Sequence, residues 1–490
     1  EIDDRIRLVA DSILLEKEFE DISKQITSRH GETLHPIAVN GLSDGARAVF
    51  YAAMIRKTAG KRPALIIVPD EKEGLKLSNA LGELSVKTLT YPLRDFIFHK
   101  ITSSHEYEHE RLRTLSALAC ASEECGAVIT TPDALMQLTM PSEVLKRDTM
   151  IIDRDEPLDM TDLTARLEAG GYVRTDLVDG TGQYSVRGGI IDIYPPSSAA
   201  PVRIELFGDE IDQMGYFDIM TQRKTENITA VDITPARELS ITPEARAEIS
   251  KAIETQMKKA SDERVKGELS AELEACDNRL ELEFADKYIS LIYENKTTLA
   301  DYYLDAAKAD GMMPLVIVQE TNACADRMKA FEFHITSEIE SMLEHGEVSP
   351  RYAMYARYSD YYEVFTDKCG ALLCDAFMQG NGGRLSGMYS FRTRATASYA
   401  DNIDLLAEDL TSYAGGKFRT VVLCENDVTA KNVVNELTER GLQAVKQPDD
   451  KPYGILTLPE GVALVVSGFN LAGFELTSTR FALLSMYQNP

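Results

Sequence analysis

Short, uninterrupted apolar runs separated by helical patterns constrain the fold of this chain most. The runs "PALIIVP" (63–69), "LVIVQ" (315–319) and "RTVVLCEN" (419–426) do not alternate with polar residues, which is typical of strands buried on both faces of a sheet. A helical pattern follows each of them, at 71–84, at the end of 314–328 and at 427–441. Strands that alternate with helices form parallel sheets covered by helices. The sequence therefore predicts an α/β protein, and its 490 residues leave room for about three domains.

The stretch from Tyr184 to Phe217 differs from these α/β regions. We expect one strand over "QYSVRGGIIDIYPP", a turn at "SSAAP", and two strands in "VRIELFGDEIDQMGYF" joined at Gly208 and Asp209. This pattern predicts a small strand-rich domain inserted into the α/β region. Residues 240–310 are helical in pattern and heavily charged, which is typical of a solvated helix surface.

Composition narrows the class of partner and the compartment. The net charge is −27, with the acidic residues spread along the chain, and such a surface repels the phosphate backbone of nucleic acid. No apolar run approaches the ~20 residues of a membrane helix, so we expect no membrane contact. The seven scattered cysteines favour a reduced, cytoplasmic protein and buried thiols over a zinc site. The missing initial Met leads us to expect a piece of a longer chain.

The segment "GLSDGARA", which begins at Gly41, is similar to a phosphate-binding loop of the form G-x-x-x-x-G-K-[ST]. Gly41 and Gly45 lie within it, but Ala46, Arg47 and Ala48 stand where Gly, Lys and Ser/Thr are required. The lysine reaches the phosphates and the hydroxyl completes the Mg²⁺ shell. Since Ala48 has no oxygen and Arg47 is a planar fork, we expect a degenerate Walker A loop that is inactive.

The partner of such a loop is an apolar strand that ends in an acidic residue able to hold Mg²⁺. The best candidate, "LVIVQETN", has Gln319 at that position, followed by Glu320. With two required positions altered, we expect no catalytic residue, no bound metal and no ATP hydrolysis by this chain. From the residues alone a second interpretation stays open, in which neither stretch was ever a nucleotide motif.

A resemblance to a known family covers nearly the whole chain. The stretch "YSVRGGIIDIYPPSSAAPVRIELFGDEID" closely resembles the matching stretch of bacterial transcription-repair coupling factors (Mfd) and of the excinuclease subunit UvrB. "GLSDGARA" resembles the degenerate loop of the coupling factors. "RATASYADNIDLLAEDL" and "SGFNLAGFEL" resemble the segment that precedes their RNA-polymerase-binding domain. The chain is therefore identified as a member of the coupling-factor family, from its N-terminal UvrB-like region.

The resemblance implies the domain organisation. A UvrB-like (degenerate RecA-like) parallel-sheet domain is expected in two halves, at 1–138 and 220–385. The β-rich insert is expected at 139–219, and a separate small α/β domain, of unknown function, at 386–490.

The resemblance also implies a function in DNA repair. The insert is expected to bind UvrA, the damage-recognition ATPase, so that the chain is a non-catalytic scaffold for transcription-coupled nucleotide excision repair. No cofactor is expected in this chain, because the ATP–Mg²⁺-driven translocase and the contacts to RNA polymerase and DNA lie further along in the family. The alternative is an ATP-dependent DNA helicase or translocase of the UvrB type that acts on its own.

The insert contains a strand, "PVRIELFGD", whose side chains alternate between two faces. One face carries Val202, Ile204 and Leu206, and the other carries Arg203, Glu205 and Phe207. If the first face is buried, the second shows a charged pair beside a large aromatic residue, which is the composition of a binding hot spot. The same alternation in "QYSVRG" places Arg187 on the exposed face, and Arg174 is close by in sequence.

The resemblance implies that arginines matching Arg174 and Arg187, and a glutamate matching Glu205, contact UvrA. Arg203 and Phe207 join this predicted UvrA-binding set from the alternation alone. The alternative is an ordinary solvated strand face with Phe207 covered by a loop.

UvrB carries an aromatic hairpin that clamps DNA, and this chain departs from it. Only "LRDFIFHKITSSHEYEHER" joins the corresponding strand to the next helix, so we expect no hairpin. We expect Phe96, Phe98 and Tyr107 to pack rather than stack on bases. His99, His105 and His109 are better explained by a charged helix start than by a metal site.

Overall fold

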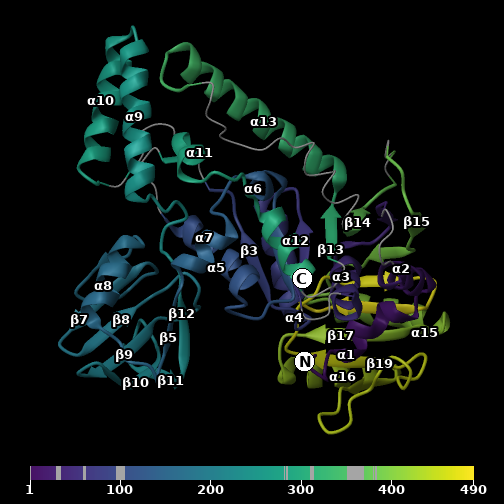
Figure 1. Ribbon diagram of the computed structural model, residues 1–490. Helices are drawn as coiled ribbons and strands as arrows, with labels where there is room; N and C mark the ends of the chain where they lie inside the picture. Colours follow the sequence, from purple (N-terminus) through teal and green to yellow (C-terminus); the bar gives the residue numbers. More distant parts are fainter. Residues whose placement is uncertain are drawn as a thin grey trace.

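The computed structural model describes residues 2–28, 35–58, 62–94, 105–280, 282, 285–309, 314–349, 369–378, 380 and 383–490. They form an α/β unit with a parallel sheet, a second α/β unit with a mixed sheet, a β-rich insert and two projecting helical arms (Figure 1). This arrangement confirms the predicted fold class. None of the helices in these ranges is long and apolar enough to span a membrane.

The body of the protein is a seven-stranded sheet with the order β15-β1-β14-β13-β2-β4-β3, in which every strand pairing is parallel. Its strands are β1 (Ile37–Asn40), β2 (Ala64–Ile67), β3 (Thr88–Tyr91), β4 (Ala127–Thr130), β13 (Leu315–Gln319), β14 (Gly370–Asp375) and β15 (Gly387–Ser390). Strands from before and after the insert therefore interleave in one sheet, and β15 extends the body past the expected border at 385.

Helices cover both faces of this sheet, as uninterrupted apolar strands require. On one face, Ala64 and Ile66 of β2 pack with α3 (Asp44–Thr58) and α4 (Glu71–Glu83). On the other face, Leu65 and Ile67 pack with a larger group of helices. That group comprises α5 (Glu106–Cys120), α6 (Pro132–Met136), α12 (Leu299–Ala309) and α13 (Thr321–Glu344).

The C-terminal unit has a six-stranded sheet of its own, with the order β16-β20-β21-β17-β19-β18. Its strands are β16 (Thr393–Ala395), β17 (Arg419–Cys424), β18 (Ala444–Lys446), β19 (Ala463–Ser467), β20 (Phe474–Leu476) and β21 (Phe481–Ser485). One face packs against α15 (Ile403–Gly415) and α16 (Asp427–Glu439). The other face shares a core with α1 (Arg7–Asp11), α2 (Lys17–Thr27) and α3.

Helix α3 therefore lies between the two sheets. Every residue from Gly45 to Ile55 is buried, so the protein encloses this part of the helix on all sides. The C-terminal unit is thus a distinct sheet that is docked on the helix that follows the degenerate loop.

The insert is built on a six-stranded sheet with the order β11-β10-β9-β8-β7-β6. Its strands are β6 (Val173–Arg174), β7 (Gln183–Arg187), β8 (Ile190–Ile193), β9 (Val202–Phe207), β10 (Glu210–Phe217) and β11 (Lys224–Asn227). Helix α8 (Met160–Ala169) and a two-stranded sheet of β5 (Met150–Asp153) and β12 (Ala230–Ile233) share its core. The insert therefore extends to residue 233, past the expected border at 219.

A tight turn divides the first expected strand of the insert. Gly188 has φ +62°, a left-handed conformation that glycine adopts without strain, and β7 and β8 pair antiparallel on either side of it. "QYSVRGGIIDIYPP" is therefore a hairpin and not one strand. The turn predicted at Gly208 and Asp209 is confirmed between β9 and β10.

Two helical arms project from the body on the side away from the C-terminal unit (Figure 1). One is a hairpin of α9 (Pro243–Lys259) and α10 (Glu263–Asp277), and the other is the long helix α13. The hairpin has a small apolar core of its own, which it shares with η2 (Ala285–Tyr288). The helical character predicted for 240–310 is confirmed for its described residues by α9, α10, η2, α11 (Ile289–Ile292) and α12.

Candidate functional site

The sheet of the insert has one face toward α8 and one face away from it. Val202 and Ile204 of β9 are buried, Leu206 is partly buried, and all three belong to the core that includes α8. Arg203, Glu205 and Phe207 alternate with them and occupy the opposite face. The predicted division of this strand is confirmed.

Arg187 stands on this second face, as predicted. Across the antiparallel ladder Arg187 pairs with Ile190, and Ile190 pairs with Glu205. Residues paired across a ladder point to the same side of the sheet. The Arg187 side chain is 47% exposed, and its Nη2 donates to Asp192 Oδ2 at 2.9 Å. The remaining donors of its guanidinium group are available at the surface of the insert.

Arg203 is placed beneath the surface rather than on it. Its side chain is 14% exposed, and it donates to Asp192 from Nε at 2.8 Å and from Nη2 at 3.0 Å. Its Nη1 donates to the carbonyl oxygen of Gln222 at 2.9 Å, and its guanidinium carbon lies 4.5 Å from the centroid of the Phe217 ring. The expectation that Arg203 is displayed to solvent is wrong, because the buried Asp192 and Phe217 hold it down.

Phe207 is displayed. It is 83% exposed at the end of β9, next to Gly208, whose φ is +64°. The alternative in which a loop covers Phe207 is therefore wrong. Glu205 is intermediate, with 34% of its side chain exposed and Lys224 Nζ 3.6 Å away. Arg187, Glu205 and Phe207 form what we call the arginine face of the insert.

Arg174 does not belong to the arginine face. It is exposed on β6, which pairs in parallel with β7 so that Arg174 is aligned with Tyr184. Tyr184 points into the core on the α8 side and donates to Glu168 of that helix at 2.8 Å. Arg174 therefore shares the α8 side, opposite Arg187. A partner that contacts both arginines must reach around the edge of the sheet at β6.

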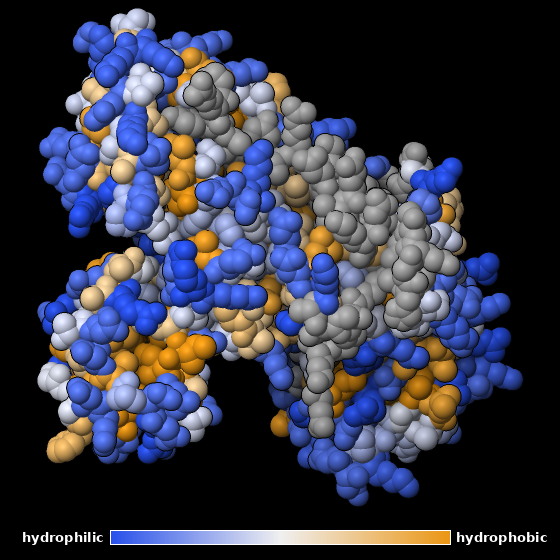
Figure 2. Space-filling model, viewed as in Figure 1, coloured by the Kyte–Doolittle hydropathy of each residue, from blue (hydrophilic) through white to orange (hydrophobic). Residues whose placement is uncertain are grey.

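Figure 2 shows the insert as a lobe set apart from the C-terminal unit by an open gap. The described surface of this lobe mixes polar and apolar residues, with apolar residues gathered on the side toward the gap. The insert is therefore accessible to a macromolecular partner from several directions.

The degenerate loop is shorter than a phosphate-binding loop. Helix α3 begins at Asp44, so Gly45 and Ala46 are helical and only three residues separate β1 from the helix. Thr393 of β16 clamps the connection, because its Oγ1 accepts from the Ser43 amide at 2.8 Å and donates to the Gly41 carbonyl at 2.6 Å. The Ser43 amide and the Gly41 carbonyl are therefore already hydrogen-bonded within the protein.

Backbone from later in the chain closes over both glycines of this loop. A Cβ on Gly41, whose φ is +83°, would lie 2.1 Å from the carbonyl oxygen of Phe391. A Cβ on Gly45 would lie 2.0 Å from the carbonyl oxygen of Ala472. The glycines permit close packing of protein backbone where a nucleotide loop would admit phosphate.

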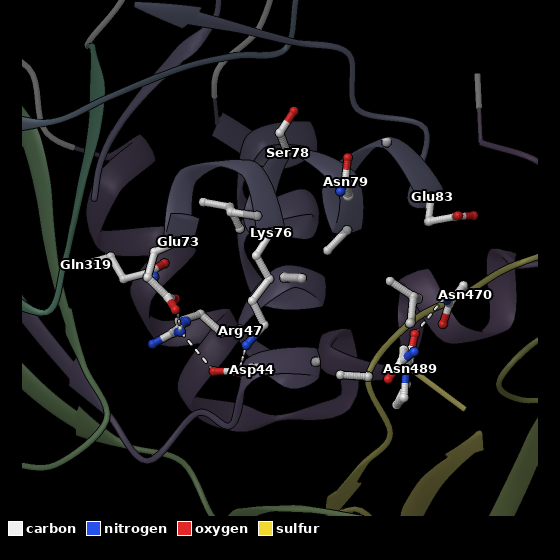
Figure 3. A pocket seen from close by; sticks show the side chains of 18 residues that line it. Asp44, Arg47, Glu73, Lys76, Ser78, Asn79, Glu83, Gln319, Asn470 and Asn489 are labelled. Atoms are coloured by element: carbon white, nitrogen blue, oxygen red, sulfur yellow. Dashed lines mark hydrogen bonds and ion pairs between the residues drawn. The ribbon is translucent and has the colours of Figure 1, made fainter. Parts of the chain in front are cut away.

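Carboxylates surround Arg47, the residue at the lysine position (Figure 3). Its Nη1 donates to Glu320 Oε1 at 3.1 Å and its Nη2 to Asp44 Oδ1 at 3.0 Å, while Glu73 Oε2 lies 4.0 Å away. Lys76 pairs with the other oxygen of Asp44. Burial acts to raise the pKa of Asp44, but the hydrogen bond from Lys76 and the charge of Arg47 outweigh it and lower that pKa.

Gln319 and Ala48 also fail to fit a magnesium nucleotide. Gln319 is 1% exposed, and its Oε1 accepts from the hydroxyl of Tyr51 at 3.1 Å. Ala48 supplies no oxygen, and the Oε1 of Glu320 also accepts from the Ala376 amide at 3.0 Å. Within the part of the chain that the structure describes, no group of three or more His, Cys, Asp or Glu side chains is arranged to hold a metal ion.

A pocket of about 700 Å³ remains beside the loop, between α3, α4 and the segment that precedes β20. Its polar lining includes Asp44, Arg47, Glu73, Lys76, Gln319 and Asn470 (Figure 3). The cations in this lining are already paired with carboxylates, so the pocket offers a polyphosphate little net attraction.

The predictions for the segment after β3 have mixed outcomes. Phe96, Phe98 and His99 lie outside the described residues, as does most of the segment in which a hairpin was excluded. His105 precedes α5, which begins at Glu106, so the predicted helix start is confirmed. Tyr107 is 55% exposed, and the expectation that it packs is wrong.

Comparisons with known proteins agree with the geometry of the insert. Residues 150–239 match the family described as the UvrB interaction domain, and the insert observed here spans 150–233. Transcription-repair-coupling factors align with almost the whole chain. The protein of Bacillus subtilis (strain 168) is 27% identical over 96% of this chain and 39% of its own length. That of Staphylococcus haemolyticus is 25% identical over 98% and 40%, and that of Staphylococcus aureus (strain MRSA252) is 25% identical over 89% and 37%.

The chain thus spans about two fifths of the length of these curated relatives. Among solved structures, the Hef helicase domain of Pyrococcus furiosus covers 94% of this chain and 85% of its own at 11% identity. Its TM-score against this chain is 0.14.

Proposed function

The chain is a relative of the transcription-repair-coupling factors, from their N-terminal UvrB-like region, and from this premise we propose that it recruits UvrA through the arginine face of its insert. One observation carries the proposal. The residues that match the UvrB interaction domain fold into a lobe of their own, and that lobe displays Phe207 and Arg187.

The chemistry of this face suits a protein partner. A large aromatic side chain that is 83% exposed offers apolar area, which becomes favourable once a partner removes it from water. The Arg187 guanidinium group can bind a carboxylate through two parallel hydrogen bonds. Truncation of such anchors typically costs about 2 kcal/mol or more of binding free energy.

We further infer that the chain acts in this role without hydrolysing ATP. The carboxylates around Arg47, the missing oxygen at Ala48 and the backbone of Ala472 against Gly45 support this part of the proposal. ATP-driven translocation and contacts to RNA polymerase and DNA then belong to the three fifths of the relatives that this chain does not cover. The setting is transcription-coupled DNA repair in the bacterial cytoplasm.

The direct test is a titration of purified UvrA with the chain and its single variants. Because Arg187 and Arg174 lie on opposite sides of the sheet, Arg187→Ala and Arg174→Ala measure two separate contacts. We expect Arg187→Ala to weaken binding at least tenfold, which corresponds to about 1.4 kcal/mol. Arg166→Ala, at an exposed arginine of α8, is the matched control and should bind like the unsubstituted chain.

Undiminished UvrA binding by the double variant Arg174→Ala/Arg187→Ala would remove this proposal. The competing function, a helicase or translocase that acts on its own, predicts ATP hydrolysis by this chain that DNA stimulates. Measurable turnover of that kind would revive it.

A further inference from the structure

A buried carboxylate, Asp192 of β8, lies beneath the arginine face and binds Arg187. We propose that Asp192, together with Arg203, is a positioning element that holds Arg187 in the orientation that UvrA recognises. This inference rests on the docking proposed above and adds to it a residue that makes no contact with the partner.

Two guanidinium groups, those of Arg187 and Arg203, share one carboxylate, that of Asp192. Asp192 is 1% exposed, and its Oδ2 accepts from Arg187 Nη2 at 2.9 Å and from Arg203 Nη2 at 3.0 Å. Its Oδ1 accepts from Arg203 Nε at 2.8 Å. The side-on pair with Arg203 fixes the carboxylate, and the fixed carboxylate in turn fixes the more exposed arginine.

Arg203 is itself immobilised from two further directions. The ring of Phe217 lies under its guanidinium group, and the Gln222 carbonyl accepts from its Nη1. Arg203 is therefore a rigid, buried cation whose charge would repel Arg187 if Asp192 were absent. The Asp192 carboxylate binds both guanidinium groups, and its negative charge offsets the repulsion between them.

Preorganisation is the expected benefit. A free arginine side chain has considerable rotamer entropy, part of which is lost when a partner immobilises it. Arg187 has lost some of that freedom before the partner arrives, since one of its nitrogens is already bonded. Its outward donors thus face the partner in a restricted set of directions.

The test is a double-mutant cycle on the whole chain, read out as UvrA affinity. Asp192→Asn keeps the shape and an acceptor oxygen but removes the charge that bridges the arginines. We expect it to weaken UvrA binding three- to tenfold in the native background and to have no further effect in the Arg187→Ala background. A merely structural role would lower affinity equally in both backgrounds, and that result would overturn the inference.

A second variant distinguishes the loss of positioning from a loss of folding. Asp192→Asn combined with Arg203→Gln replaces the buried ion pair by two neutral amides, so no buried charge is left unpaired. We expect this double variant to keep the native melting temperature and to bind UvrA as weakly as Asp192→Asn does. Native affinity in the folded double variant would overturn the inference. Glu226→Gln, at an exposed carboxylate of β11, is the control and should change neither quantity.

The outcomes separate the two proposals. If the unsubstituted chain binds UvrA and Asp192→Asn binds it equally well, only the positioning role falls. If the unsubstituted chain does not bind UvrA, the proposed function falls and the positioning role falls with it.

Discussion

The junction between the insert and the body depends on Glu238, a carboxylate with no exposed surface. It follows β12 at the exit of the insert, and its Oε1 accepts from Arg111 Nη2 of α5 at 2.7 Å and from Thr139 Oγ1 at 2.6 Å. The Nε of Arg94 lies 3.1 Å from Oε2, although it is not aligned for a hydrogen bond. Replacing Glu238 by Ala therefore removes the counter-charge of a buried guanidinium group.

The size of the effect follows from the burial of Arg111, which is 0% exposed. Removing one partner of a buried ion pair typically costs about 3–5 kcal/mol, because the other charge stays buried and uncompensated. At about 2–4 °C per kcal/mol for a domain of this size, Glu238→Ala should lower the melting temperature of the body by roughly 6–20 °C. Glu238→Gln keeps the acceptor oxygen and should cost less.

Differential scanning calorimetry of the whole chain measures this effect, with Glu226→Gln as a control that should melt like the native chain. A melting temperature for Glu238→Ala within about 2 °C of the native value would refute the reasoning, since it would mean that Arg111 is not dependent on Glu238.

The same ion pairs predict how the stability of the folded chain falls at acid pH. Burial acts to raise the pKa of Glu238, but the charges of Arg111 and Arg94 outweigh it and lower that pKa in the folded chain. A carboxylate whose folded pKa is lowered adds stability above its unfolded pKa, about 4.3, and loses it as the pH falls below that value. Calorimetry between pH 3 and 7 should show a shallower acid slope for Glu238→Gln. An unchanged slope would contradict the assignment.

Further predictions concern the other parts of the chain. Gly45→Ala places a Cβ against the Ala472 carbonyl and should loosen the packing of the C-terminal unit, which limited proteolysis would detect as faster cleavage. The control is Gly267→Ala on α10, where the new Cβ meets no atom within 4 Å, and this change should be neutral or stabilising. Phe207→Ala should weaken UvrA binding at least tenfold without a change in melting temperature, because the ring is already exposed. Isothermal titration with ATP–Mg²⁺ should show no binding heat, and a measured heat would contradict the paired state of Arg47.

Local patterns were enough to predict the strands and the class of fold. An uninterrupted apolar run such as 63–69 is buried on both faces, and the structure places it as β2 in the interior of a parallel sheet. Local patterns could not predict the order of the strands in the sheet. Strands β13 and β14 lie beside β2 and β1 through contacts between residues some 250–330 positions apart in the sequence. The structure also moves the border from 219 to 233, because β11 pairs with the neighbouring strand β10 in a short hairpin and β12 pairs with β5 at the start of the insert.

The candidate site was predictable to the extent that strand alternation determines it. Alternation identified the exposure of Phe207 and the face of Arg187. It missed the burial of Arg203, which depends on Phe217 and on the turn that carries Gln222. It also missed the side on which Arg174 lies, because a loop of eight residues sets the register of β6 against β7.

That the degenerate loop is inactive stays a prediction, made from the groups that the sequence lacks. The structure adds protein groups that pack against the loop and support this prediction. Thr393 and Ala472 reach Gly41 and Gly45 from about 350–430 residues further along the chain. No local pattern in "GLSDGARA" indicates that another unit covers it. Only the glycine at position 45, in a helix where alanine would be preferred, gave a signal of close packing.

Hydrogen–deuterium exchange of the whole chain, alone and with UvrA, tests most directly whether the arginine face is the docking surface. The turns at Gly188 and Gly208 flank this face, and a Cβ on either glycine would meet no atom within 4 Å. We predict that UvrA slows amide exchange at both turns and leaves the C-terminal unit unchanged. Slowed exchange confined to the C-terminal unit, with both turns exchanging as in the free chain, would contradict the account.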